Sequence, residues 1–281
     1  MNAVVAHRGR ADSRTLRPAF VHVLRSEWIK LLSLPSSGLG LLGIFVIGVG
    51  GSLFLGVSLE SSGAPSVFSV ERTMADVTVP TVVIGQIIAG VIGVMVIGSE
   101  YSSGGIQPTF VAVPDRLRVL SAKSMVAFTA CTATAVVTVF SAWAITTPIY
   151  AQFGLAAPLS APGVLLALFS SAMYLGFCAL FGVGVGTLVR STTAGSIIVF
   201  LTTLLLPVAA SLLPFGLASR ILRIIQFGNA GDAMTRISPA GSPFLDLWAG
   251  HISVGAGWMI ASIWAAVALA AGAIALRSKD V

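Results

Sequence analysis

The chain has 281 residues, of which 56% are hydrophobic and only 9% are charged, with a mean hydropathy of +0.97 and a formal net charge of +6. A soluble domain carries roughly 25% charged residues, so this composition excludes a water-covered surface and predicts an integral membrane protein. The basic residues form no folded domain outside the apolar runs, which argues against nucleic-acid binding.

The first expected element is an amphipathic helix over residues 18–34. One arc of this helix is apolar and holds Phe20, Leu24, Trp28, Leu31 and Leu32. The opposite arc is polar and holds His22, Arg25, Ser26, Lys30 and Ser33. Glu27 and Ile29 interrupt this division. The pattern, with its Trp and basic residues, predicts a helix lying along the cytoplasmic membrane surface, and a soluble linker helix is the alternative.

Six apolar runs are long enough to cross a bilayer, for which about 20 residues are needed. They cover approximately Ser37 to Val57, Val79 to Gly98, Met125 to Ala151, Pro162 to Leu188, Ala194 to Phe215, and Ser253 to Leu276. The glycines of "GVGVG" at 182–186 favour close helix packing over a phosphate-binding loop, because the run lacks the Lys-Ser/Thr ending. We therefore expect an all-α protein with a tail and surface helix over 1–36 and a six-helix transmembrane domain over 37–281.

The basic residues orient these spans. One side of the predicted membrane has twelve of them: Arg8, Arg10, Arg14, Arg17, Arg25, Lys30, Arg116, Arg118, Lys123, Arg190, Arg277 and Lys279. The other side has four, which are Arg72, Arg220, Arg223 and Arg236. The bias predicts that both termini are cytoplasmic. Residues 217–227, "LASRILRIIQF", are amphipathic and predict a short extracellular helix after the fifth span, which accounts for two of the exceptions.

The predicted spans contain no Asp, Glu, Lys, Arg or His, although proton- and ion-coupled carriers usually place such groups in the membrane. This weakens the carrier interpretation without excluding sodium coordination by carbonyls and hydroxyls. The sequence contains no catalytic, metal-binding or nucleotide-binding motif, so we expect no enzyme activity, catalytic residue, metal or cofactor in this chain. Cys131 and Cys178 fall in apolar runs and are expected to be small buried side chains.

The loop after the second span, "GSEYSSGGIQPTFVAVPDRLRVLSAK" at 98–123, is more apolar in its middle than a loop facing only water. Gly104 and Gly105 break the preceding helix, Pro114 ends a short helical piece "IQPTFVAV", and 115–123 can start the next helix. A partner protein covering this piece accounts for its composition.

This loop resembles that of the ABC-2 type transporter permeases, the membrane subunits of ATP-driven exporters. The positions that carry the resemblance are Glu100, Tyr101, Gly104, Pro114, Arg116, Ala122 and Lys123. Gly105 departs from the usual Thr, which removes a possible hydroxyl helix cap. "SEWIKLLSLPS" is similar to the family's N-terminal elbow helix, "FGNAGDAM" at 227–234 to a stretch outside the fifth span, and "ALRSKDV" to the usual ending.

The resemblance implies a dimer of permeases, identical or homologous, with two cytoplasmic subunits that bind ATP and Mg. The loop would form a coupling helix seated in a groove of each ATPase. The residues it assigns to this coupling are Glu100, Tyr101, Gly104, Ile106, Gln107, Pro108, Thr109, Phe110, Pro114, Arg116 and Lys123. Glu100 is expected to pair with Arg116 or Lys123, and the alternative is that these charges only anchor helix ends at lipid headgroups.

The expected function is export of a hydrophobic or amphipathic molecule, such as a drug, antibiotic or lipid, across the plasma membrane. A low-polarity pathway is expected between spans two and five, near Gln86, Thr202 and Thr203. Two alternatives stay open at this point: a secondary carrier or channel that works without an ATPase, and a structural membrane scaffold.

Overall fold

The computed structural model describes residues 19–62, 69–102, 104, 115–214, 216–237, 243–246 and 251–278. Within these ranges the chain is almost entirely helical, with one antiparallel strand pair of β1 (Leu245–Asp246) and β2 (His251–Ile252). The predicted all-α class is confirmed. The expected helix of residues 106–113 lies outside the described residues.

Six helical segments are long and apolar enough to cross a membrane, as the sequence predicts. They are α2 (Pro35–Ser62), α3 (Val70–Ser102), α5 (Arg116–Gln152), α6 (Val164–Val189), the continuous run of α7 (Thr192–Phe200), the π-helix η1 (Leu201–Leu205) and α8 (Leu206–Ser211), and α11 (Val254–Ser278). The helices α3 and α5 extend well past their apolar runs. The carboxylate of Asp115 caps the N-terminus of α5 by accepting from the backbone N–H of Arg118, which starts the helix ahead of the apolar run.

The helix expected over residues 18–34 is present as α1 (Phe20–Ser33), and it ends where Leu34 becomes extended just before Pro35 starts α2. Its predicted faces need a correction. The buried stripe is Val23, Glu27 and Leu31, whereas Phe20 and Leu32 of the expected apolar arc are exposed. The reason is that α1 packs against α5 and α2, so a third face, toward the protein, adds to those toward lipid and water.

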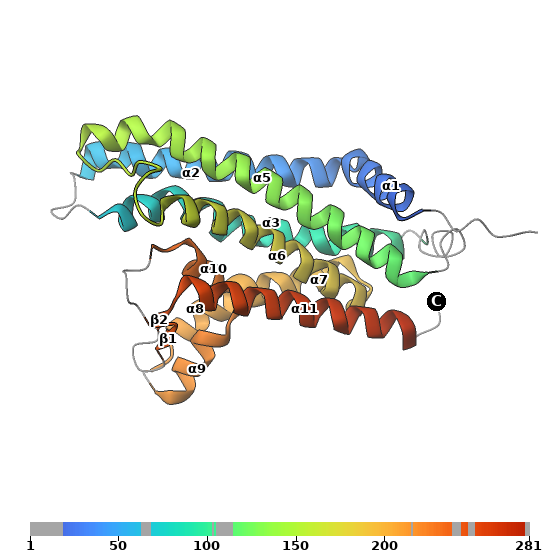
Figure 1. The fold of residues 1–281 in the computed structure, drawn as a ribbon. Coiled ribbons are helices and arrows are strands. Elements are labelled where there is room, and N and C mark those ends of the chain that lie inside the picture. Colours follow the sequence, from blue (N-terminus) through green and yellow to red (C-terminus); the bar gives the residue numbers. More distant parts are fainter. Residues whose placement is uncertain are drawn as a thin grey trace, which may run out of the picture.

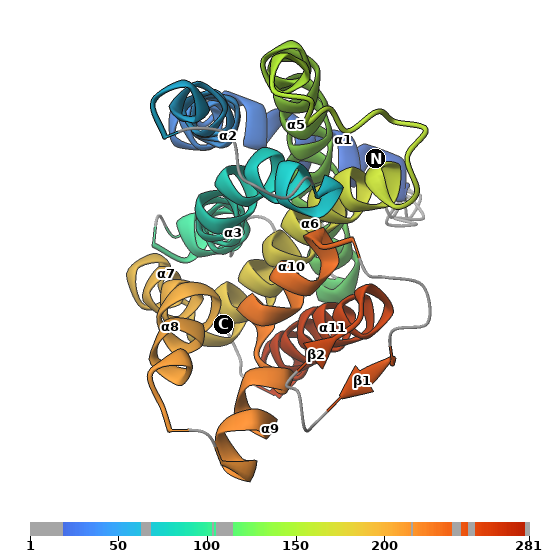
Figure 2. The ribbon, with the colours of Figure 1, turned by 90° about the vertical axis from the view of Figure 1, so that its left-hand side faces the viewer.

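The bundle is organised around α6, which packs against α3, α5 and α11 and also against α7 and α10 (Phe227–Thr235). Figure 2, which looks along the bundle, places α6 among these helices. Close approach depends on glycine, as expected for the "GVGVG" run. A Cβ on Gly182 would lie 1.9 Å from the carbonyl oxygen of Gly90 in α3, and one on Gly184 would lie 2.3 Å from the carbonyl carbon of Ala268 in α11.

The two ends of the bundle differ in structure (Figure 1). One end carries α1, the last turn of α3, the first turns of α5 and the last turn of α11, and we call it the α1 end. The opposite end carries α9 (Leu217–Ile225), α10 and the strand pair. The predicted amphipathic helix after the fifth span is present as α9, with Leu217, Ile221 and Ile225 exposed and Ile224 buried. Arg223 of α9 donates to the carbonyls of Ala210 and Ser211 at the end of α8 and to that of Leu213 just beyond it.

Candidate functional site

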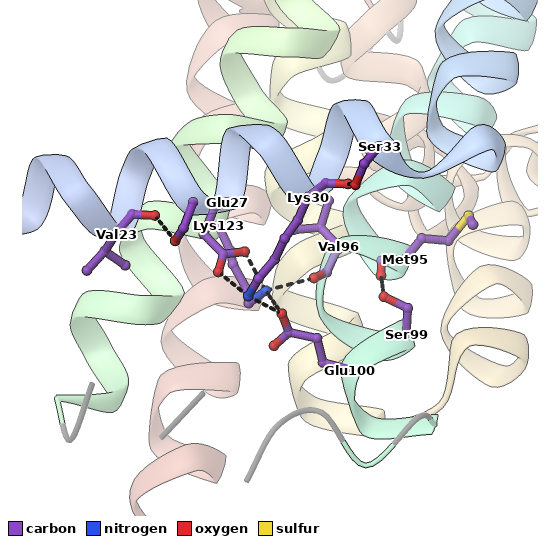
Figure 3. Close-up of polar contacts among 10 residues, drawn as sticks. Val23, Glu27, Lys30, Ser33, Met95, Val96, Ser99, Glu100 and Lys123 are labelled. Atoms are coloured by element: carbon purple, nitrogen blue, oxygen red, sulfur yellow. Dashed lines mark hydrogen bonds and ion pairs between the residues drawn. The ribbon is translucent and has the colours of Figure 1, made fainter. Parts of the chain in front are cut away.

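The most concentrated group of charges in the described residues lies at the α1 end, where two glutamates and two lysines from three helices meet (Figure 3). We call Glu27, Lys30, Glu100 and Lys123 the charge cluster. The Nζ atom of Lys123 in α5 lies 2.6 Å from Oε2 of Glu27 in α1 and 2.7 Å from Oε1 of Glu100 in α3. The Nζ atom of Lys30 in α1 lies 2.8 Å from each glutamate. Each lysine therefore binds both glutamates.

Helix spacing brings these side chains together. Glu27 and Lys30 are three residues apart on α1 and so face the same side of it. Val96 and Glu100 are four residues apart on α3, and Lys123 also donates to the Val96 carbonyl at 3.1 Å. The three N–H groups of Lys123 thus have three acceptors, which is the full capacity of an ammonium.

Burial makes the pairing of these charges necessary. The side chains of Lys123 and Glu27 are 1% and 3% exposed, that of Glu100 is 13% exposed, and that of Lys30 is 45% exposed. Desolvation alone would lower the pKa of Lys30, but its hydrogen bonds to Glu100 and Glu27 and their charges outweigh it, so the pKa lies above its usual value. The cluster has no net charge when all four groups are ionised, so burial does not leave an uncompensated ion.

A second group of contacts surrounds Tyr101, the neighbour of Glu100. The guanidinium carbon of Arg190, in the turn between α6 and α7, lies 5.4 Å from the centroid of the Tyr101 ring, a cation–π distance. Arg190 also donates to the carbonyl of Ala275 at 3.4 Å, and Arg116 donates to that of Leu276 at 2.8 Å. The last carbonyls of a helix have no partner within it, so two arginines complete the C-terminal end of α11.

The predicted coupling residues can be compared with this geometry where they are described. The expected partnership of Glu100 is found with Lys123, while Arg116, the other candidate, binds the end of α11. Tyr101 lies against Arg190, Ala122 is fully buried, and Gly104 has a φ of 72° in the left-handed region that favours glycine. The remaining members lie outside the described residues, and they are Ile106, Gln107, Pro108, Thr109, Phe110 and Pro114.

Sequence reasoning missed Glu27 and Lys30 as members of this site. The helical pattern predicts Glu27 as an interruption of the apolar arc and Lys30 as part of the opposite, polar arc, so neither is expected in a buried cluster. A usable signal exists, because Glu27 stands midway between Val23 and Leu31 on one helical stripe, and all three are buried. The predicted spans contain no ionisable side chain, but α3 and α5 extend beyond them and carry Asp76, Glu100 and Lys123 in these extensions. Each of the three has an ionic partner, which offsets the cost of a charge close to the membrane.

The residues expected to line a pathway lie near α10, and two of the three are buried. Gln86 is buried and its Oε1 accepts from the hydroxyl of Tyr174 at 2.8 Å. Thr203 is buried in η1, and its backbone carbonyl lies 2.2 Å from where a Cβ on Gly228 of α10 would stand. Thr202 is half-buried and donates to the carbonyl of Ile198. Gln86, through the Tyr174 hydroxyl that also reaches the carbonyl of Phe227, and Thr203, through its contact with Gly228, therefore both lie beside α10.

Cys131 and Cys178 are free and fully buried, which confirms the expectation for them. Among the residues that the structure describes, no group of three His, Cys, Asp or Glu side chains is arranged to hold a metal ion. No protein-family model matches the chain, and no curated protein matches it. The candidate site thus stands on its own geometry.

Proposed function

We propose that this chain is the membrane-spanning permease subunit of an ATP-driven exporter, acting with a separate subunit that binds ATP and Mg and with a second permease. The proposal includes the plasma membrane as its location, with the α1 end in the cytoplasm. In this arrangement α1 is the interfacial elbow helix, residues 106–113 form the coupling helix, and α9 lies at the outer interface. The substrate is hydrophobic or amphipathic.

One observation carries the proposal. Four positions that carry the resemblance to the ABC-2 permeases have contacts in the described residues. These contacts join the end of α3 and the start of α5, which lie on either side of residues 103–114, to the rest of the bundle. Glu100 and Lys123 bind each other and α1, while Tyr101 contacts Arg190 and Arg116 binds the end of α11. A partner that pushes on this loop would thus act on α1, α3, α5 and α11 together, which is what coupling to a separate ATPase requires.

The test is purification of the tagged full chain from its native host, expressed with its neighbouring genes. We expect a protein with a phosphate-binding loop motif to co-purify, and the complex to hydrolyse ATP. A chain in which residues 106–113 are replaced by Gly and Ser of equal length should insert normally but lose the ATPase. If the chain alone moves substrate in proteoliposomes without ATP, or no ATPase co-purifies, the carrier or channel interpretation replaces ours.

A further inference from the structure

We infer that the charge cluster is a joint in which the ends of α3 and α5 exchange ionic partners as they move, with Glu27 and Lys30 of α1 as the positioning residues. Only the cause of this motion depends on the proposed function; the exchange of partners does not. The observation behind it is the double pairing, in which both lysines lie within 2.6–2.8 Å of both glutamates. Two complete pairings are therefore present in one structure.

The first pairing joins α3 to α5 directly, through Lys123 and Glu100, and leaves Lys30 with Glu27 on α1. The second pairing joins each of these helices to α1, through Lys123 with Glu27 and Lys30 with Glu100. When the ends of α3 and α5 lie together, both pairings hold. When they separate, the first is broken and the second still gives every charge a partner.

Burial explains why such a device is needed. Lys123 is 1% exposed, so losing Glu100 without a substitute would leave an ammonium unpaired in an apolar surrounding. Glu100 also has an unused hydrogen-bond acceptor. Both lysines bind its Oε1, whereas its buried Oε2 has no hydrogen-bond partner within the described residues. As Lys30 and Lys123 move apart, Glu100 can therefore keep Lys30 on either oxygen.

The helix α1 is built to follow such a motion. It is separate from α2, because Leu34 is extended between the two helices, so α1 can tilt without bending a membrane span. Buried ion pairs contribute little net stability compared with apolar residues of the same volume, and their best-attested use is to fix or switch an arrangement. The placement of a Glu and a Lys one turn apart on a short, separately hinged helix fits a switch.

The experiment measures the distance between the ends of α3 and α5 with spin labels on the full-length chain in nanodiscs. Ser102 and Ser121 are exposed residues on these two ends, so S102C and S121C can carry the labels. The native cysteines are fully buried and should not react. In the otherwise wild-type chain we expect two distances, whose proportions change when the complex with the ATPase binds ATP.

The variant E27Q/K30Q removes one acid and one base, keeps the size of the Glu27 side chain and shortens the half-exposed side chain at position 30. Only the pairing of Lys123 with Glu100 then remains, so the longer distance should fall about a hundredfold or more in population and drop below detection. K30Q alone gives a milder version, because Lys30 is 45% exposed and the other contacts stay. The matched control is D232N/R236Q, which removes an exposed ion pair between α10 and the residue that follows it, at the opposite end of the bundle, and should leave both distances unchanged.

A single distance in the wild-type chain with and without ATP, or an E27Q/K30Q variant with the wild-type distribution, overturns the joint. Gel filtration and melting temperature confirm that each variant is folded. The two proposals fail separately: two distances in the chain alone, lost in E27Q/K30Q, support the joint even if no ATPase co-purifies. Conversely, a co-purifying ATPase with an unchanged distance distribution supports the permease and rejects the joint.

Discussion

Lys123 and Glu27 are 96 residues apart in the sequence, yet Nζ and Oε2 approach to 2.6 Å with both side chains almost completely buried. This contact ties α1, which precedes the first span, to the start of the third span. A buried pair of this kind costs most when only one of its members is lost, because the other is then left charged and desolvated. The first prediction uses this asymmetry.

We predict that Glu27→Leu lowers the free energy of unfolding by about 3–5 kcal/mol, whereas Glu27→Leu combined with Lys123→Met lowers it by less than about 1 kcal/mol. In the double variant Lys30 and Glu100 still pair with each other, at 2.8 Å in the present structure. Reversible unfolding in mixed detergent micelles measures both changes. Glu71→Gln, an exposed carboxylate at the other end of α3, is the control. Equal losses in the single and double variants would contradict the pairing.

Close packing of α6 on α3 gives the second prediction. Gly182→Ala should destabilise the protein by about 1–3 kcal/mol, because the added Cβ would meet the backbone carbonyl of Gly90, which cannot turn away. Gly38→Ala in α2 is the matched control, since nothing lies within 4 Å of its Cβ position. There the same change should stabilise the helix by about 0.5–1 kcal/mol. Opposite signs in the same unfolding assay are the expected outcome.

The third prediction separates a packing role of Gln86 from a pathway role. The hydroxyl of Tyr174 donates to Oε1 of Gln86 at 2.8 Å and lies 3.2 Å from the carbonyl of Phe227, all within the core. Tyr174→Phe should cost about 1–2 kcal/mol of stability, and the cost combined with Gln86→Leu should be less than the sum of the two. If Gln86 instead contacts substrate, Gln86→Leu changes substrate affinity in a transport assay at unchanged stability.

The raised pKa of Lys30 predicts a pH dependence at the basic end of the scale. A group with a raised pKa in the folded state stabilises that state fully below its unfolded pKa, about 10.4, and loses the contribution as pH rises through the folded value. The difference in melting temperature between wild type and Lys30→Gln should therefore be constant near pH 8 and shrink above about pH 10.4. Arg25→Gln, an exposed cation on the same helix, should show no such change.

Much of the fold could be predicted because lipid imposes a simple rule on the sequence. The six apolar runs mark the spans, since a helix in a bilayer needs about 20 apolar residues. The last turn of α3 and the first turns of α5 could not be located this way, because they are polar and are held by tertiary contacts. The resemblance singled out Glu100 and Lys123, and these two do pair. Their partners on α1 could not be predicted, because Glu27 is buried by the packing of α1 against the bundle, which the sequence pattern of α1 does not define.

The orientation of the bundle gives the last prediction. Twelve basic residues belong to the side of the α1 end and four to the other side, so the α1 end should face the cytoplasm. Ser121 at the α1 end and Ser211 at the opposite end are both exposed. In intact cells a membrane-impermeant thiol reagent should label Ser211→Cys and not Ser121→Cys, and lysis should make Ser121→Cys reactive. The wild-type chain, with both native cysteines buried, supplies the blank. The reverse pattern would place the loop between α3 and α5 outside the cell, where no ATP-binding subunit could reach it.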